Sequence, residues 1–366
     1  MLQFLSQRGI GRRSFAAVIA ALCVAVFTAS SQPAEAAKKE SFRIAWSIYV
    51  GWMPWAYADE MGIVNKWADK YGIEIEVVQI NDYIESINQF TAGAFDGTVM
   101  TNMDALSIPA GGGVDSTALI LGDFSNGNDG LVVKGEGDIA ALKGKNVNLV
   151  ELSVSHYLLA RALDSVKLAE RDLTVVNTSD ADMVAAFKTA DVEAVVTWNP
   201  LLSEIAAEPG AKVLYTSADI PGEIIDMMVV NTEVLNANPD FGKALVGAWY
   251  ETMAIMSADD EAGRAARTFM GEKSGTDLAG YEAQLATTKM FYEPAEAIAF
   301  AKSPELVETM DVVRQFLFTH GILGEGAPSP DYVGMTFPSG ATLGDQGNTK
   351  LRFDASFMSM AADGML

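Results

Sequence analysis

The stretch from Phe42 to Asn102 constrains the fold most strongly, because its pattern predicts a β-α-β unit. Pro54 marks a helix start, since proline at a first helical position loses no hydrogen bond. Parallel strands joined by helices bind small molecules at the carboxyl ends of the strands. The three strand tips, Trp46-Ser47, Asn81-Asp82 and Thr101-Asn102, are therefore predicted to form half of a ligand cleft. The predicted elements are strand 42–46, helices 54–61 and 64–71, strand 74–80, helix 83–92 and strand 97–100.

The β-α rhythm continues and predicts an α/β fold with two domains joined by crossing strands, a hinge, and a ligand held between them. Residues 122–129 are polar and glycine-rich and are predicted to form a loop, whereas 328–366 is predicted to be loop-rich. Further strands are predicted at 117–121, 131–133, 146–150, 173–176, 192–196, 213–215 and 224–230. The predicted domain ranges are 38–133 for the first part of domain I, 134–229 for domain II and 230–366 for a helical return onto domain I.

Residues 1–37 are predicted to be a secretory signal peptide that is not part of the fold. Arg12-Arg13 precedes an apolar run from Ser14 to Thr28, and Pro33-Ala34-Glu35-Ala36-Ala37 offers a small-residue cleavage site. The apolar run is short for a membrane span. The arginine pair fits either a twin-arginine signal or an ordinary export signal with two adjacent arginines.

Composition limits the cellular compartment and the classes of partner that fit the exported chain. The 366 residues carry a formal net charge of −23, and the one cysteine, Cys23, lies within the predicted signal. Removing the signal takes away three arginines and one glutamate, which brings the net charge to about −25. This acidity argues against nucleic acid and anionic membranes as partners and raises the local concentration of a cation. Export and a mature chain without thiols fit a bacterial periplasm.

Four motifs in fixed order carry a resemblance to a known family. They are Leu142-Lys143-Gly144-Lys145, Ser153-Val154-Ser155-His156-Tyr157, Asp191-Val192-Glu193-Ala194 and Trp198-Asn199-Pro200. The chain resembles the substrate-binding proteins of ABC importers for nitrate, sulfonates and taurine, although Ala141 stands where that family often has an acid. Within the family it looks most like the binding proteins encoded beside urea carboxylase, which are described as urea or guanidine importers.

The resemblance implies a type II-like periplasmic binding protein with a helical C-terminal extension. It also implies a monomer that delivers a small molecule to an ABC permease in the inner membrane, without catalysis, cofactor or metal. The matching positions at strand tips and in the loops beside them are Trp46, Ser47, Asp82, Asn102, Asp104, Asp129, Ser153, Ser155, Trp198 and Asp226. Glu151 at a strand tip and Glu223 on the return crossing complete the predicted ligand-binding set.

The predicted set contains several acids and no arginine, which disfavours an anionic ligand. A guanidinium ion donates paired hydrogen bonds to carboxylates and can stack on an indole ring, so guanidine fits better than nitrate or a sulfonate. The first predicted charge partners are Glu151 and Asp226, with Trp198 as the stacking face. Neutral urea would instead use mixed donors such as Asn102 and Ser153.

Other interpretations remain open for single residues and for the whole chain. Asp82, Asp104, Ser153 and Ser155 also fit helix-capping roles, and Trp52 fits a packing role. Taurine, another sulfonate or nitrate is the alternative ligand. The fold family also includes enzymes that make a thiamine pyrimidine precursor, but those carry a cysteine-rich motif that the mature chain lacks. A sensor that works without an importer is the third class.

Overall fold

Nine strands form one mixed sheet that combines segments from early and late in the chain. The computed structural model describes residues 38–324 and 326–366, so the predicted export signal lies outside the described residues. The strand order is β13-β12-β14-β4-β10-β3-β1-β2, and β11 pairs with β4. The strands are β1 (Ser41–Trp46), β2 (Glu74–Gln79), β3 (Gly97–Thr101), β4 (Ser116–Ser125), β10 (Ile225–Asn231), β11 (Thr288–Met290), β12 (Gly334–Thr336), β13 (Thr342–Leu343) and β14 (Thr349–Phe353).

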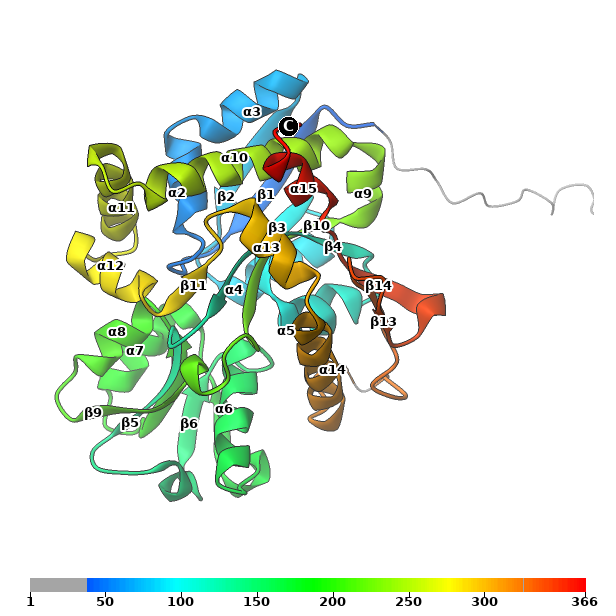
Figure 1. Ribbon diagram of the computed structural model, residues 1–366. Coiled ribbons are helices and arrows are strands. Elements are labelled where there is room, and N and C mark those ends of the chain that lie inside the picture. The colour runs from blue at the N-terminus through cyan, green and yellow to red at the C-terminus, as the bar shows by residue number, and fades with distance from the viewer. Residues whose placement is uncertain (1–37, 325) are drawn as a thin grey trace, which may run out of the picture. The chain divides into compact units, whose positions relative to one another are not determined.

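Five consecutive strands form a second sheet in the order β7-β6-β8-β5-β9. Its strands are β5 (Asp129–Lys134), β6 (Asn146–Leu149), β7 (Thr174–Asn177), β8 (Ala194–Trp198) and β9 (Ala211–Thr216). Figure 1 shows β5, β6 and β9 in green, apart from the blue and cyan strands β1, β2 and β3. The chain passes between the sheets twice, from β4 to β5 and from β9 to β10.

Helices follow the strands as the alternating pattern predicts. Pro54 occupies the first turn of α2, and the Asp82 carboxylate caps α4 by accepting from the Glu85 N–H at 2.9 Å. The helices of the first half are α2 (Met53–Glu60), α3 (Ile63–Tyr71), α4 (Tyr83–Thr91), α5 (Asn102–Ala105), α6 (Val154–Ser165), α7 (Asp180–Lys188) and α8 (Leu201–Ala206). A π-helical turn, Leu106–Ala110, continues α5, and short 3₁₀ turns lie at Ile139–Leu142, Glu170–Asp172, Ser217–Asp219 and Gln346–Asn348.

Helices dominate the chain after β10 and cover the first sheet. Trp249 of α10 packs against Trp55 of α2 with ring centroids 5.2 Å apart, and Phe241 stacks on Phe42 of β1 at 4.4 Å. These helices are α9 (Thr232–Ala237), α10 (Pro239–Ser257), α11 (Glu261–Lys273), α12 (Leu278–Leu285), α13 (Pro294–Ala301), α14 (Pro304–Thr319) and α15 (Ser356–Ala362). Within the described ranges, no helix is long and apolar enough to cross a membrane.

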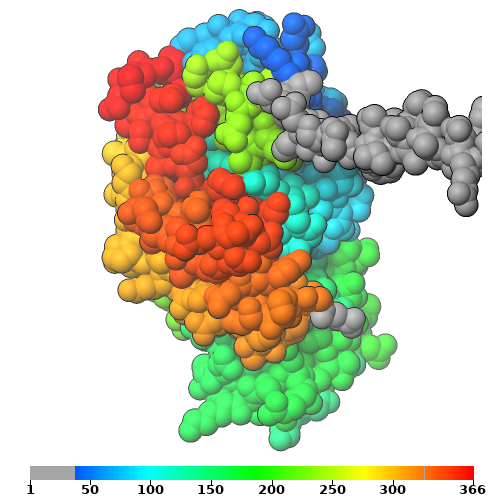
Figure 2. Space-filling model, turned by 90° about the vertical axis from the view of Figure 1, so that its right-hand side faces the viewer, coloured from blue at the N-terminus to red at the C-terminus, as the bar shows by residue number. Residues whose placement is uncertain are grey.

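Helix α14 links the two sheets from outside. It packs against α5, and its Phe316 ring meets the Tyr157 ring of α6 edge-on at 4.7 Å. His320, just past its end, contacts the Glu170 carboxylate at 2.9 Å. Figure 2 shows the segment after Pro304, in orange to red, on the face where it meets the green residues of the second sheet.

The predicted α/β fold with two sheets is confirmed, and so is the β-α-β unit at 42–102. Both predicted loop regions contain strands. Strand β4 runs on to Ser125, because Asp123 and Phe124 pair with β10 and β11, and Gly122 forms a bulge between Leu121 and Asp123. Residues 334–353 contain β12, β13 and β14, and β14 extends the first sheet by pairing with β4. The domain ranges remain a prediction.

Candidate ligand-binding site

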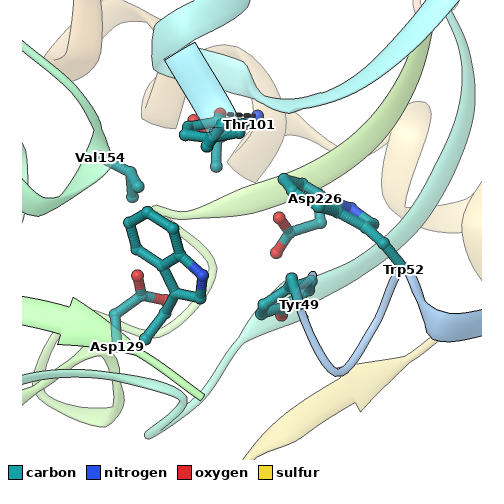
Figure 3. A pocket seen from close by; sticks show the side chains of 8 residues that line it. Tyr49, Trp52, Thr101, Asp129, Val154 and Asp226 are labelled. Atoms are coloured by element: carbon teal, nitrogen blue, oxygen red, sulfur yellow. Dashed lines mark hydrogen bonds between the residues drawn. The ribbon is translucent and has the colours of Figure 1, made fainter. Parts of the chain in front are cut away.

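A small cavity, with about 10 Å³ of space open to the centre of a water-sized sphere, lies where strand ends of both sheets meet. This volume is far below the 300–1,000 Å³ that is usual for drug-sized ligands, so a ligand held here must be very small. Figure 3 shows the Asp226 carboxylate pointing into this space and Asp129 on the other side of it. The lining residues are Tyr49, Trp52, Tyr83, Thr101, Asp129, Val154, Trp198 and Asp226.

The strand registers explain why these side chains meet. In the first sheet Asp226, near the start of β10, lies opposite Thr101 at the end of β3. In the second sheet Asp129, at the start of β5, lies opposite Trp198 at the end of β8. Carboxyl ends of parallel strands and the starts of returning strands therefore converge on one point.

Four aromatic rings form a continuous wall of the cavity. Centroids are 4.9 Å apart between Tyr49 and Trp52, 5.5 Å between Trp52 and Tyr83, and 5.6 Å between Tyr83 and Trp198. The Trp198 indole N–H donates to the Ile48 carbonyl at 3.3 Å, which joins the end of β8 to the loop after β1. The wall therefore joins the two sheets, because Trp198 belongs to β8 and the other three rings lie in segments that follow β1 and β2 of the first sheet.

Asp129 is 3% exposed and is oriented by hydroxyl groups. Its Oδ2 accepts from Ser125 Oγ at 2.5 Å, and Ser125 Oγ lies 2.7 Å from Ser217 Oγ. Burial raises the pKa of Asp129 from 3.8 to about 7, and the hydrogen bond from Ser125 lowers it in part.

Asp226 and Asp123 form a buried carboxyl pair on neighbouring strands. They face each other across β10 and β4, within hydrogen-bonding reach. Tyr49 Oη donates to Asp123 Oδ1 at 2.9 Å, whereas the Oδ2 atoms of both aspartates are buried without a hydrogen-bond partner. Burial raises the pKa of both carboxyls. The negative charges of Asp123 and Asp129 raise the pKa of Asp226 further.

Asp104 does not line the cavity but forms hydrogen bonds with two residues that do. Its Oδ2 accepts from Tyr83 Oη at 2.6 Å and from Thr101 Oγ1 at 2.9 Å, while its Oδ1 is buried without a partner. Burial raises the pKa of Asp104 to about 6, although these hydrogen bonds lower it in part. The carboxyl fixes two lining side chains and adds a fourth acid.

These four carboxyls lack a positive partner within the described part of the chain. No Lys, Arg or His side chain there forms a hydrogen bond or ion pair with Asp104, Asp123, Asp129 or Asp226, and none lines the cavity. An unpaired buried carboxylate costs several kcal/mol, so such groups hold protons or acquire a cation. In residues 38–324 and 326–366 no group of three or more His, Cys, Asp or Glu side chains is arranged to hold a metal ion.

Three predicted site residues line the cavity together, namely Asp129, Trp198 and Asp226. Asp104 supports the wall, as described above. Ser47 and Ser155 are buried, and their hydroxyl oxygens have no hydrogen-bond partner, but neither lines the cavity. Trp46 is buried in the core at the end of β1.

The other predicted residues do not reach the cavity, and each has a different structural role. Glu151 is exposed and lines a surface cleft with Asp82, the cap of α4. Ser153 caps α6, accepting from the Ser155 N–H at 3.2 Å. Asn102 Oδ1 accepts from the Ile225 N–H at 3.0 Å and so holds the return crossing.

Glu223 is also occupied within the protein. Its carboxylate accepts from Arg161 Nε at 2.8 Å and from Arg161 Nη2 at 2.9 Å. Tyr157 Oη donates to the same carboxylate at 2.5 Å. These three donors occupy the Glu223 carboxylate, so the prediction that it contacts the ligand is wrong for this structure. Arg161 lies within α6 and not at a strand tip.

Sequence reasoning did not name five of the lining residues as ligand contacts, although it placed one of them, Thr101, at a cleft-forming strand tip, and it missed the acid Asp123 behind the wall. These five residues lie at predicted strand tips or a few residues after them. The rule that ligands bind at the carboxyl ends of strands therefore indicated the right part of the chain for Tyr49, Trp52, Tyr83, Thr101 and Val154. Asp123 was hidden because β4 was predicted to end at residue 121.

A family model described as the NMT1-like family matches residues 35–270. Among curated proteins, a binding protein of Brucella abortus (strain 2308) is 25% identical over 211 residues, which cover 56% of this chain and 63% of that protein. The matched region thus spans less than two thirds of this relative's length.

Solved structures share the fold over most of their length. The alkanesulfonate-binding protein from Xanthomonas axonopodis pv. citri, bound to MOPS, has a TM-score of 0.65 and 17% identity, covering 79% of this chain and 96% of that one. The periplasmic nitrate-binding protein from Synechocystis PCC 6803 has a TM-score of 0.56 and 14% identity, covering 90% and 99%. The fold is therefore that of periplasmic binding proteins.

Proposed function

This chain belongs to the NMT1-like family, and from that premise we propose that it is the periplasmic substrate-binding component of an ABC importer for a small planar cation. Guanidinium is the ligand that the charges of the lining favour. The solved structures that share the fold are named as an alkanesulfonate-binding and a nitrate-binding protein, which supports a carrier without catalysis. A permease in the inner membrane would receive the ligand.

One observation carries the choice of a cation, namely the four buried carboxyls without a basic partner. A guanidinium ion brings one delocalised positive charge and N–H donors in a fixed fork. Asp226 and Asp129 face the cavity from different sheets and supply acceptors on two sides. The Trp198 ring offers a stacking face, a contact worth about 0.5–2 kcal/mol.

Urea and anionic ligands remain the competitors. Urea has a similar shape but brings no charge, so it leaves the carboxyl cluster unneutralised. A sulfonate or nitrate is favoured by the names of the structural relatives. However, an anion here would meet carboxyls in a lining without Lys or Arg among the described residues, a repulsive arrangement in a dry site.

Thermal unfolding of the mature protein with a panel of ligands tests the proposal. Guanidinium, urea, taurine, an alkanesulfonate and nitrate are added in turn at a few millimolar. Selective binding to the folded state adds about 2.7 kcal/mol at a hundredfold excess over the dissociation constant. The denaturing effect of guanidinium at this concentration is below about 0.1 kcal/mol.

We expect guanidinium to raise the unfolding temperature most, and Asp129→Asn and Asp226→Asn to abolish that rise. Glu151→Gln is the matched control, because it removes a carboxylate that lies outside the cavity. Sodium chloride at equal ionic strength controls for screening. A rise with nitrate or a sulfonate and none with guanidinium would refute the cation site while leaving a binding-protein role intact.

A further inference from the structure

We infer that Asp123 and Asp226 share one proton when the site is empty and release it when a cation binds, so that binding exchanges a cation for a proton. The inference rests on the proposed function, since it describes how the same site would accept its cation. Asp226 faces the cavity, whereas Asp123 lies behind it on β4 and is absent from the lining.

Both carboxyls of this pair are buried, so water does not stabilise their negative charge. Asp123 is 0% exposed and Asp226 is 2% exposed. Their side chains meet across an antiparallel strand pair, and Tyr49 satisfies one oxygen of Asp123. Two ionised carboxylates at such close range repel strongly in a dry site, so one proton between them is the stable arrangement.

The loop after β1 seals the back of this pair. A Cβ placed on Gly51 would lie 2.4 Å from Asp123 Oδ2 and 2.6 Å from Tyr49 Cε1. The backbone therefore lies directly against the carboxyl, and the empty pair has no space for a side chain beside it. Asp123 Oδ2, on the side of this backbone, has no hydrogen-bond partner among the described residues.

Among the described residues, no Lys, Arg or His side chain pairs with these two carboxyls. On β11, which pairs with β4, Lys289 is half exposed and its ammonium lies 3.6 Å from Glu296. The neighbouring ionisable groups that interact with the pair are all acids or phenols. They are Tyr49, Asp129, Tyr281 and Tyr292.

The exchange balances in charge and atoms. In the empty site the pair holds one proton and one negative charge. A guanidinium ion placed against Asp226 stabilises the second negative charge, and the O–H bond of the pair breaks as its proton passes to solvent. The net charge of the occupied site then equals that of the empty one, and affinity increases up to tenfold per pH unit while the pair remains protonated.

Titration calorimetry of the full mature chain with guanidinium chloride counts the protons. Runs near pH 7 in buffers of different ionisation enthalpy give the number of protons released per ion bound. Asp123→Asn keeps the acceptor for Tyr49 and offers an amide N–H to Asp226 in place of the shared proton. We expect the count to fall by about one in this variant while binding persists.

Infrared difference spectroscopy gives a readout that needs no ligand. The carboxylic-acid C=O band of the empty protein at neutral pH should weaken in Asp123→Asn, and in the wild type it should weaken when guanidinium is added. Asp96→Asn is the control, because Asp96 is also buried but pairs with Lys39 at 2.5 Å and should change neither readout.

The outcomes separate the two proposals. Guanidinium binding with an unchanged proton count in Asp123→Asn overturns the exchange and leaves the proposed ligand standing. An empty-site spectrum without the Asp123-dependent acid band overturns the shared proton itself. If guanidinium produces no binding heat, the proposed ligand is refuted, and so is the proton exchange proposed for that ion.

Discussion

Replacing Asp129 with asparagine should remove a pH-dependent loss of stability from the empty protein. Folding raises the pKa of Asp129 from 3.8 to about 7, chiefly through burial. Between these values the folded protein binds more protons at this carboxyl than the unfolded chain does. The free energy of unfolding therefore falls as the pH rises through this window, and the stabilising contribution is fully present only below the lower value.

The size of the effect follows from the gap between the two pKa values. One pKa unit corresponds to about 1.4 kcal/mol. For a group that titrates near 7 when folded and near 3.8 when unfolded, the loss between pH 5 and pH 8 is about 2–3 kcal/mol. Asparagine does not titrate and keeps an oxygen to accept from Ser125 Oγ, so this part of the slope should disappear.

Calorimetric unfolding of the ligand-free protein at several pH values between 5 and 8 measures the difference. The neighbouring acids also titrate, so the quantity of interest is the wild-type slope minus the Asp129→Asn slope. Asp96→Asn serves as the control, because its carboxyl has Lys39 as a partner. Parallel stability curves for the wild type and Asp129→Asn would refute the reasoning.

Two further predictions concern packing and an internal ion pair. Gly51→Ala should lower stability by about 1–3 kcal/mol and abolish ligand-induced stabilisation, because the new methyl group overlaps Asp123 Oδ2 and the Tyr49 ring. Glu223→Gln should lower stability by about 1–3 kcal/mol, because it removes the charge that pairs with both Arg161 donors. Thermal unfolding with and without guanidinium measures both variants.

Each of these variants has a matched control. Gly137→Ala adds the same methyl group where the nearest atom lies 3.8 Å away, so it should leave ligand stabilisation unchanged. Glu76→Gln breaks an exposed pair with Arg43 and should cost less than about 1 kcal/mol. A Gly51→Ala protein of wild-type stability, or equal losses for the two glutamates, would contradict the packing and burial arguments.

The strand tips were predictable because the β-α-β pattern is local in the sequence. Apolar strands, Pro54 and the Asp82 cap fix the elements between 42 and 102, and the carboxyl-end rule then gives the face of the sheet. Trp198 and Asp226 were predicted from the family resemblance, and both line the cavity. The carboxyl-end rule does not say how deeply a side chain is buried, which is why exposed Glu151 was preferred to buried Asp129 as a charge partner.

The errors have a common physical cause in long-range pairing. Residues 122–129 have the composition of a loop, yet β10 and β11, more than 100 residues later, pair with Asp123 and Phe124 within this stretch. Glu223 was assigned to the ligand because its partner Arg161 is 62 residues away. Local pattern does not report such partners, so polar residues in buried strands are the hardest to place.

The strand order has a consequence for how the chain folds. The second sheet is complete within residues 129–216, whereas the first sheet needs β10 and also β14, which pairs Leu351 with Ser116. Contacts so distant in sequence close slowly, because the entropy of a long loop must be paid before the strands pair. When the chain becomes available amino end first, the second sheet therefore has all its strands early. At that point the first sheet still lacks its central strand β10 and the edge formed by β14, β12 and β13.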